Sequence, residues 1–226
     1  SLYQPACRQN FTILSTDGFW NSDPDSYPAI SGDDKDGLLL KNDKLGLAYQ
    51  FKAVDPYAAP QTSTLADIAA HFWKKDLRTD LANSVPTTPE DPGFWQHMVT
   101  FGVSIGLRGT LNPATAVADI TSGIVNWPTI NFGSDTDLGK IDDLLHASIN
   151  SRGEFFSAAD PDDLTQGLSE AVSKIVSRSG SNSAAATNSS VISGNSLVFN
   201  AGYVSNIWTG QVSAFALTSD GIPAED

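Results

Sequence analysis

The sequence predicts an α/β fold: a parallel sheet with flanking helices, followed by a linker and a short β segment. Three observations lead to this prediction. Apolar strand-like runs alternate with amphipathic helical patterns between residues 11 and 178, as in a parallel sheet. The first run ends in Thr-Asp-Gly, which places a carboxylate at the carboxyl end of a strand. After residue 178 the composition changes to Ser, Ala, Asn and Gly, and then to β-like alternation.

Composition and charge exclude several classes of protein. The 226 residues are enough for one large domain, or one and a half, with a sizeable core. The 13 basic and 26 acidic residues give a net charge of −13, which argues against nucleic-acid binding and against docking on anionic lipid. No apolar run is long enough for a transmembrane segment. Cys7 has no partner cysteine in the chain, and Ser1 is not a natural start, so we expect a segment of a longer protein. Few lysines, five tryptophans and abundant Asn, Ser, Thr and Gly are typical of a secreted one.

Residues 11–16 are expected to form the first strand. The apolar, β-branched run from Phe11 to Leu14 is typical of a strand buried on both faces. Asp17 follows this strand, and Gly18 allows a sharp turn. Because ligands of open α/β sheets bind outside the carboxyl ends of the strands, Asp17 is a candidate ligand for Mg²⁺ or Ca²⁺. The alternative is that Asp17 only forms an Asx-turn or caps the next segment.

A long polar stretch, residues 19–60, comes next and contains a second acidic candidate. Asp33, Asp34 and Asp36 lie between two glycines, in a pattern similar to a calcium loop. The pattern lacks the ligand spacing and the later glutamate of an EF-hand. These three residues are therefore weaker metal candidates than Asp17, and a solvated acidic turn is the alternative.

Five further elements are expected before the change in composition. They are a helix over 64–77, a strand over 98–105, a helix over 140–150, a strand over 154–157 and a helix over 161–178. In each helix, apolar residues recur every three or four positions and form one stripe. Thr64 and Asp67 resemble a capping box. Asp160 and Pro161 suit the N-cap and the first position of the last helix.

The C-terminal part is expected to be a separate β region. Residues 179–195 have the composition of a linker, and residues 196–226 contain strand-like runs at 196–203 and 211–217. A lone hairpin is only marginally stable in water. This tail therefore predicts a β domain that continues beyond the segment.

Histidines and tryptophans give no sign of an enzyme. His71, His97 and His146 could in principle form a zinc or acid–base site, but no zinc-protease spacing and no Gly-x-Ser-x-Gly motif is present. We therefore expect structural histidines. The five tryptophans could form a carbohydrate-binding platform, although such residues are more often core or interface anchors.

The order of elements resembles the second half of a von Willebrand factor A domain, which has a Rossmann-like sheet. The resemblance implies that residues 1–178 form this half-domain, with 19–60 as an acidic insertion. In that family a Thr-Asp-Gly-like strand end supplies one aspartate to a metal-ion-dependent adhesion site, and Asp17 is the matching position. The Asp-x-Ser-x-Ser motif and the threonine that complete the site precede this strand in the family. They are absent here, so the implied Mg²⁺ or Ca²⁺ site is incomplete.

Longer motifs resemble the PilC/PilY-type assembly and tip-associated adhesin proteins of type IV pili. They are Cys7–Asn21, Thr64–Ala69, Phe72–Arg78, Phe94–Phe101, Ile141–Ala147, Ser151–Phe156 and Trp208–Phe215. The last of them resembles the first strands of that family's β-propeller. The resemblance implies a non-enzymatic protein that is secreted to the bacterial cell surface, outer membrane or pilus tip. It also implies pilus assembly and adhesion, with minor pilins and host or abiotic surface ligands as partners.

Two other functions remain open from the sequence. Quinoprotein-like dehydrogenases share the propeller architecture, so the chain could be a fragment of such an enzyme. It could also be another secreted module that binds cations or carbohydrate.

Overall fold

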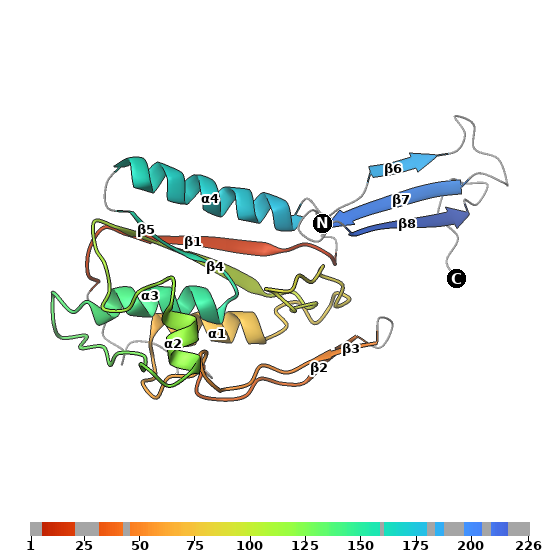
Figure 1. Ribbon diagram of the computed structural model, residues 1–226. Helices are drawn as coiled ribbons and strands as arrows, with labels where there is room; N and C mark the ends of the chain where they lie inside the picture. Colours follow the sequence, from red (N-terminus) through yellow and green to blue (C-terminus); the bar gives the residue numbers. More distant parts are fainter. Residues whose placement is uncertain are drawn as a thin grey trace. The chain divides into compact units, whose positions relative to one another are not determined.

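The fold in Figure 1 is a computed structural model that describes residues 6–20, 32–42, 46–158, 161–179, 184–187, 197–204 and 209–216. The chain divides into two units, Ser1–Val172 and Ser173–Asp226, and each is considered by itself. The first unit contains the parallel sheet, and the second contains a small antiparallel sheet.

The first unit is built on three parallel strands, β1 (Asn10–Thr16), β4 (Met98–Ile105) and β5 (Phe155–Ala158). Their order is β1-β4-β5, so β4 lies in the middle. The six interior residues of β4, Val99–Ser104, are all buried, as a central parallel strand requires. The three strands lie within one residue of the expected ranges, and the α/β fold class is confirmed.

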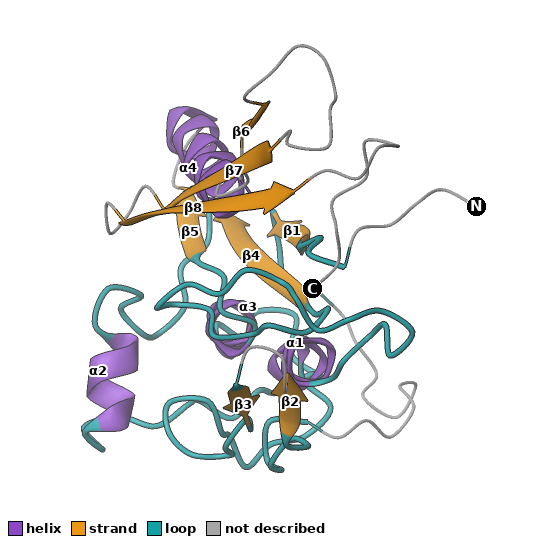
Figure 2. Ribbon diagram, turned by 90° about the vertical axis from the view of Figure 1, so that its right-hand side faces the viewer, coloured by secondary structure: helices purple, strands orange, loops and turns teal. Residues whose placement is uncertain are grey.

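Helices cover both faces of this sheet (Figures 1 and 2). Helices α1 (Leu65–Lys74) and α3 (Gly139–Asn150) pack against each other and against β4 on one face. The first part of α4 (Pro161–Ser179) lies over the opposite face, where Gly167 approaches Phe156 of β5. A von Willebrand factor A-like arrangement is consistent with these layers and stays a prediction.

Helix α1 ends earlier than its apolar periodicity indicates. The expected range was 64–77, but Lys75 already has extended backbone angles, with φ −112° and ψ 137°. Two residues later, the backbone N–H of Leu77 donates to the carbonyl oxygen of Gln96. A hydrogen bond to a distant segment has replaced the next helical bond.

The expectation that residues 11–14 are buried on both faces is wrong. Ile13 is 38% exposed and Leu14 is 37% exposed. In the part of the chain that the structure describes, β1 pairs with β4 along one side and is an edge strand. Apolar composition identified the strand correctly, but its burial depends on the order of strands in the sheet.

Three short elements lie in regions where the sequence showed no periodicity. Strands β2 (Leu40–Asn42) and β3 (Leu47–Tyr49) pair in antiparallel fashion within the acidic insertion. Helix α2 (Ala116–Thr121) follows β4 and contributes Ile120 to a cluster with Trp127. The sequence analysis did not predict these elements because each is shorter than the window over which periodicity can be recognised.

The second unit contains β6 (Ala184–Thr187), β7 (Leu197–Val204) and β8 (Thr209–Ala216), which form an antiparallel sheet in that order. The two expected strand-like runs correspond to β7 and β8. Strand β6 lies inside the stretch 179–195 that was expected to be a linker, and most of that stretch lies outside the described residues. The linker, the domain boundaries and the propeller stay predictions. Among the described residues, no helix is long and apolar enough to cross a membrane.

Among the described glycines of the first unit, Gly153 leaves the least room between a Cβ atom and neighbouring backbone. A Cβ atom at this position would lie 1.9 Å from the carbonyl oxygen of Thr100 in β4. Because backbone cannot move aside as a flexible side chain can, we expect Gly153→Ala to lower the free energy of unfolding by about 3 kcal/mol. Denaturant unfolding followed by tryptophan fluorescence measures this loss.

Gly18→Ala is the matched control, since a Cβ there has no heavy atom within 4 Å. Equal losses for the two variants would show that β4 does not approach residue 153 so closely.

Candidate functional site

Asp17 lies at the carboxyl end of β1 with its side chain exposed. The turn around it is closed by its neighbour: the Thr16 hydroxyl donates to the carbonyl oxygen of Gly18 at 2.6 Å and accepts from the Gly18 N–H at 3.3 Å. The Asp17 carboxylate is therefore not the group that makes this turn. The carboxylate is exposed, and its role as a cation ligand stays a prediction.

Lys140, which the sequence analysis did not single out, fixes the chain just after Asp17. It lies in the first turn of α3 and is wholly buried. Its ammonium group donates to the carbonyl oxygens of Trp20 and Ser134, each at 2.7 Å. These bonds tie the turn that carries Asp17 to the helix that covers the sheet.

Among the described residues, no complete metal site forms around Asp17. Within the described ranges, no group of three or more His, Cys, Asp or Glu side chains could hold a metal ion. Asp142, in the first turn of α3, accepts hydrogen bonds from the N–H groups of Thr110 and Leu111 and from the Thr110 hydroxyl. Its oxygens are already engaged by the protein.

The weaker candidates, Asp33, Asp34 and Asp36, lie in different environments. Asp33 is fully buried, whereas Asp34 and Asp36 are at the surface. Asp36 pairs with Lys52 at 2.7 Å and also accepts from the Ala53 N–H. The Lys52 hydrogen bond, followed by the one from Ala53, holds the pKa of the Asp36 carboxyl below its usual value. The three side chains do not converge on one point.

Asp143 caps α1 from outside that helix. Its two carboxylate oxygens accept from the N–H groups of Leu65 at 2.8 Å and Ala66 at 3.0 Å. Within α1, Thr64 and Asp67 form the expected capping box, which is confirmed. Burial, reinforced by the nearby Asp67 carboxylate and opposed by the two N–H donors, raises the pKa of Asp143 to about 7.

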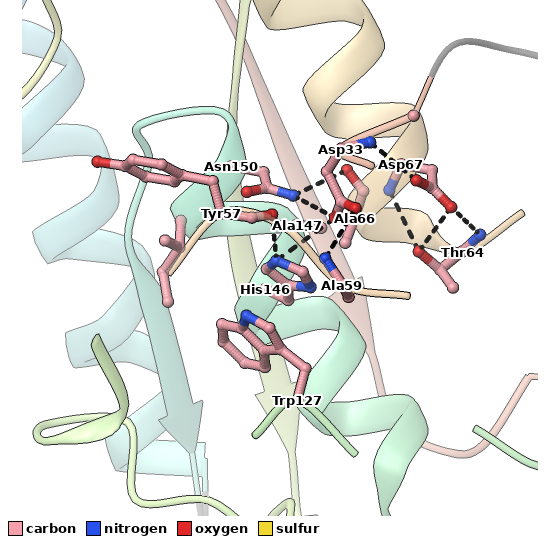
Figure 3. Close-up of polar contacts among 12 residues, drawn as sticks. Asp33, Tyr57, Ala59, Thr64, Ala66, Asp67, Trp127, His146, Ala147 and Asn150 are labelled. Carbon is pink, nitrogen blue, oxygen red and sulfur yellow. Dashed lines mark hydrogen bonds and ion pairs between the residues drawn. The ribbon is translucent and has the colours of Figure 1, made fainter. Parts of the chain in front are cut away.

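Asp33 joins the acidic insertion to this cluster (Figure 3). Its N–H donates to Asp67 at 2.9 Å. Its carboxyl oxygens accept from the Ala59 N–H at 3.1 Å and from the Asn150 amide at 2.8 Å. Because Asp67 lies on α1 and Asn150 on α3, Asp33 fastens the insertion to both helices.

His146 completes the cluster from α3. Its Nε2 is 2.8 Å from the Tyr57 carbonyl oxygen, and its ring stacks on Trp127 with the two centroids 3.9 Å apart. Burial lowers the pKa of His146 to about 3, although the Tyr57 contact opposes this shift. A cavity of about 10 Å³ beside the ring, lined partly by Thr64 and Asp143, holds at most one water molecule. The cluster has no space for a substrate and acts as a structural fastening.

His97 and three of the tryptophans are also built into the core. Trp73 and Trp95 are at most 1% exposed, and Trp127 is 9% exposed. They cannot form an exposed carbohydrate platform, so the core-anchor alternative holds for these three. His97 is buried between the carboxylate of Asp91 at 3.0 Å and a backbone carbonyl oxygen, which agrees with the expected structural role.

Comparison with known proteins supports part of the resemblance. The chain is 32% identical, over 194 residues, to the type IV pilus biogenesis factor PilY1 of Pseudomonas aeruginosa strain PAO1. The chain is similar to a segment of PilY1. The PilY1 proteins of strains PAK and UCBPP-PA14 are each 31% identical, over 194 and 211 residues. The matches cover 75–82% of this chain and 16–17% of the relatives.

These findings support a PilY1-like type IV pilus factor. No model of a protein family matches the chain, and no solved structure matches it. The von Willebrand factor A-like and propeller parts of the resemblance stay predictions.

We expect Asp143→Ala to lower the free energy of unfolding by about 2 kcal/mol, because it leaves two N–H groups at the start of α1 without an acceptor. Denaturant unfolding at pH 7 measures the loss. Asp143→Asn should retain part of the stability, since an amide oxygen can still accept one of these bonds. The control is Asp135→Ala, at an exposed position just before α3, the helix that carries Asp143. A loss for Asp135→Ala as large as that for Asp143→Ala would contradict the capping role.

Proposed function

We propose that the chain is part of a non-enzymatic, PilY-like protein of type IV pili that promotes pilus assembly and surface attachment. The similarity to PilY1 over 75–82% of the chain carries this proposal. On this view the protein is secreted and acts at the bacterial surface, outer membrane or pilus tip. Its partners are minor pilins and ligands on host or abiotic surfaces.

We further propose that Asp17 supplies one ligand to a Mg²⁺ or Ca²⁺ site in the longer protein. Its side chain is exposed, Thr16 closes the turn around it, and Lys140 fixes the chain three residues later at Trp20. A fixed exposed carboxylate can take part in a site, but one carboxylate cannot set octahedral or higher coordination alone. Hydroxyl and carboxylate oxygens from outside this chain would complete the site, and adhesion would depend on the cation.

A chimera tests the assembly role. In it, the matching segment of P. aeruginosa PilY1 is replaced by this chain and expressed in a strain without its own PilY1. We expect surface pili, recovered by shearing, to be restored, whereas PilY1 without the segment should not restore them. Absence of pili in cells that contain the chimera at the level of native PilY1 would contradict the proposal.

Asp17→Asn separates cation binding from assembly. We expect it to weaken Mg²⁺ or Ca²⁺ binding to the longer protein about tenfold or more, because a charged oxygen ligand is lost. Calorimetry measures binding, and cation-dependent attachment should fall in parallel while pili still assemble. Glu90→Gln, at another exposed carboxylate that is not a metal candidate, is the control and should change neither. Unchanged binding by the Asp17→Asn protein would contradict the site. Tight, Asp17-dependent binding by the 226-residue chain alone would contradict the external ligands.

A further inference from the structure

Asp33 and His146 meet in the interior, although they are far apart in the sequence. The carboxyl oxygen Oδ2 of Asp33 is 3.4 Å from Nε2 of His146. Asp33 is 0% exposed and His146 is 3% exposed. Such a contact can be an ion pair, imidazolium with carboxylate, or a neutral pair, imidazole with carboxylic acid. The two forms carry the same atoms and differ in the position of one proton.

Hydrogen-bond accounting favours the neutral form of His146. The Tyr57 carbonyl oxygen is only an acceptor, so Nε2 carries a hydrogen and donates it to that oxygen at 2.8 Å. The same Nε2 is farther from Asp33, and the indole of Trp127 covers the ring in a stacked geometry. His146 therefore donates its Nε2 hydrogen to the neutral Tyr57 carbonyl oxygen. In an ion pair, an imidazolium would donate that hydrogen to the Asp33 carboxylate.

The charges around Asp33 also disfavour an ionised carboxylate. Helix α1 presents Asp67 and Lys74, and α3 presents Asp143 and His146. The Lys74 ammonium donates to the carbonyl oxygens of Gly32 and Lys35, beside Asp33. Asp67 thus opposes the Lys74 ammonium in the surroundings of Asp33, and Asp143, whose own pKa is raised to about 7, adds a second negative charge as the pH approaches that value. The donors Ala59 and Asn150 favour ionisation, and full burial opposes it.

Asn150 offers an acceptor to a protonated Asp33. Its amide nitrogen faces Asp33, and its Oδ1 is buried with no hydrogen-bond partner. Rotation of this amide by half a turn would bring Oδ1 to the Asp33 hydroxyl, at the cost of the 3.3 Å bond that the amide nitrogen donates to the Ala66 carbonyl oxygen. Only a protonated Asp33 can donate a hydrogen bond to this oxygen.

We propose that Asp33 and His146 are held as a neutral pair, carboxylic acid beside imidazole. This pair joins the acidic insertion to α1 and α3. Its formation on folding at weakly acidic pH neither takes up nor releases protons in net. In the unfolded chain at such pH, Asp33 has lost a proton and His146 has gained one. Folding therefore moves one proton, in net, from His146 to Asp33. The number of protons bound by the two groups together does not change.

The linkage of each group has a definite sign. Burial raises the pKa of Asp33 from 3.8 to about 7, so its contribution to stability is present below 3.8 and is lost as pH rises to about 7. Burial lowers the pKa of His146 from 6.5 to about 3, so its contribution is present above 6.5 and is lost as pH falls towards 3. Between about pH 4 and 6.5 the two slopes are opposite and cancel.

Single substitutions reveal how the free energy of unfolding changes with pH for each group alone. The unfolding equilibrium constant is measured for the 226-residue chain by denaturant titration between pH 4 and 7. Relative to wild type, we expect Asp33→Asn to gain stability as pH rises, by up to about tenfold per pH unit. His146→Gln should gain relative stability as pH falls, by a similar factor. The double variant should run parallel to wild type up to about pH 6.5. Asp36→Asn, on the same segment, should show nearly no slope relative to wild type, because the pKa of Asp36 is lowered below the range of the titration.

An ion pair would keep both groups charged in the folded and the unfolded chain between pH 4 and 6.5, so wild type would again show no slope there. The protonation of the His146 ring in the wild-type chain, measured below, therefore decides between the ion pair and the neutral pair. Parallel profiles for both single variants and wild type would overturn the proposal.

A spectroscopic measurement on the unsubstituted chain is independent of whether the variants fold. With ¹⁵N-labelled histidine, the ring nitrogens of His146 at pH 5 should show the neutral tautomer protonated at Nε2. The signature of an imidazolium at that pH would contradict the neutral pair.

Discussion

The contact of the Asp143 carboxylate with the first turn of α1 is the interaction on which the helical layer depends. It supplies acceptors to two N–H groups that a helix leaves unpaired at its start, and it does so from the neighbouring helix. The start of α1 is therefore fixed with respect to α3, and Asp67 is placed to receive the N–H of Asp33. The position of the acidic insertion depends on this geometry, because Asp33, which holds the insertion, bonds to both helices.

The fold could be predicted from the sequence wherever local patterns determine the structure. The apolar stripe of 161–178, the alternation of 98–105 and the Thr64 to Asp67 capping box are each contained in a few consecutive residues. The exposure of Ile13 and Leu14 was not accessible, because it depends on which strand lies beside β1. The early end of α1 likewise depends on a hydrogen bond from Leu77 to Gln96.

The buried cluster could be predicted only in part, for the same reason. An acidic turn in solvent and a buried acceptor have the same local pattern, so Asp33 looked like its neighbours Asp34 and Asp36. Its partner Asn150 lies 117 positions away in the sequence, which no short motif records. The Thr-Asp-Gly turn was different: it follows a strand directly, so the place of Asp17 at a sheet edge was predictable.

The half-exposed edge strand has a consequence for the behaviour of this chain in solution. Strand β1 presents apolar side chains, and within the described residues its outer edge has no paired neighbour, which makes it a template for association with other strands. The net charge of −13 opposes such encounters through repulsion between like-charged molecules. Repulsion of this kind is screened within about 10 Å at 0.1 M salt. Colloidal stability of the isolated chain thus depends on ionic strength, and high salt favours self-association.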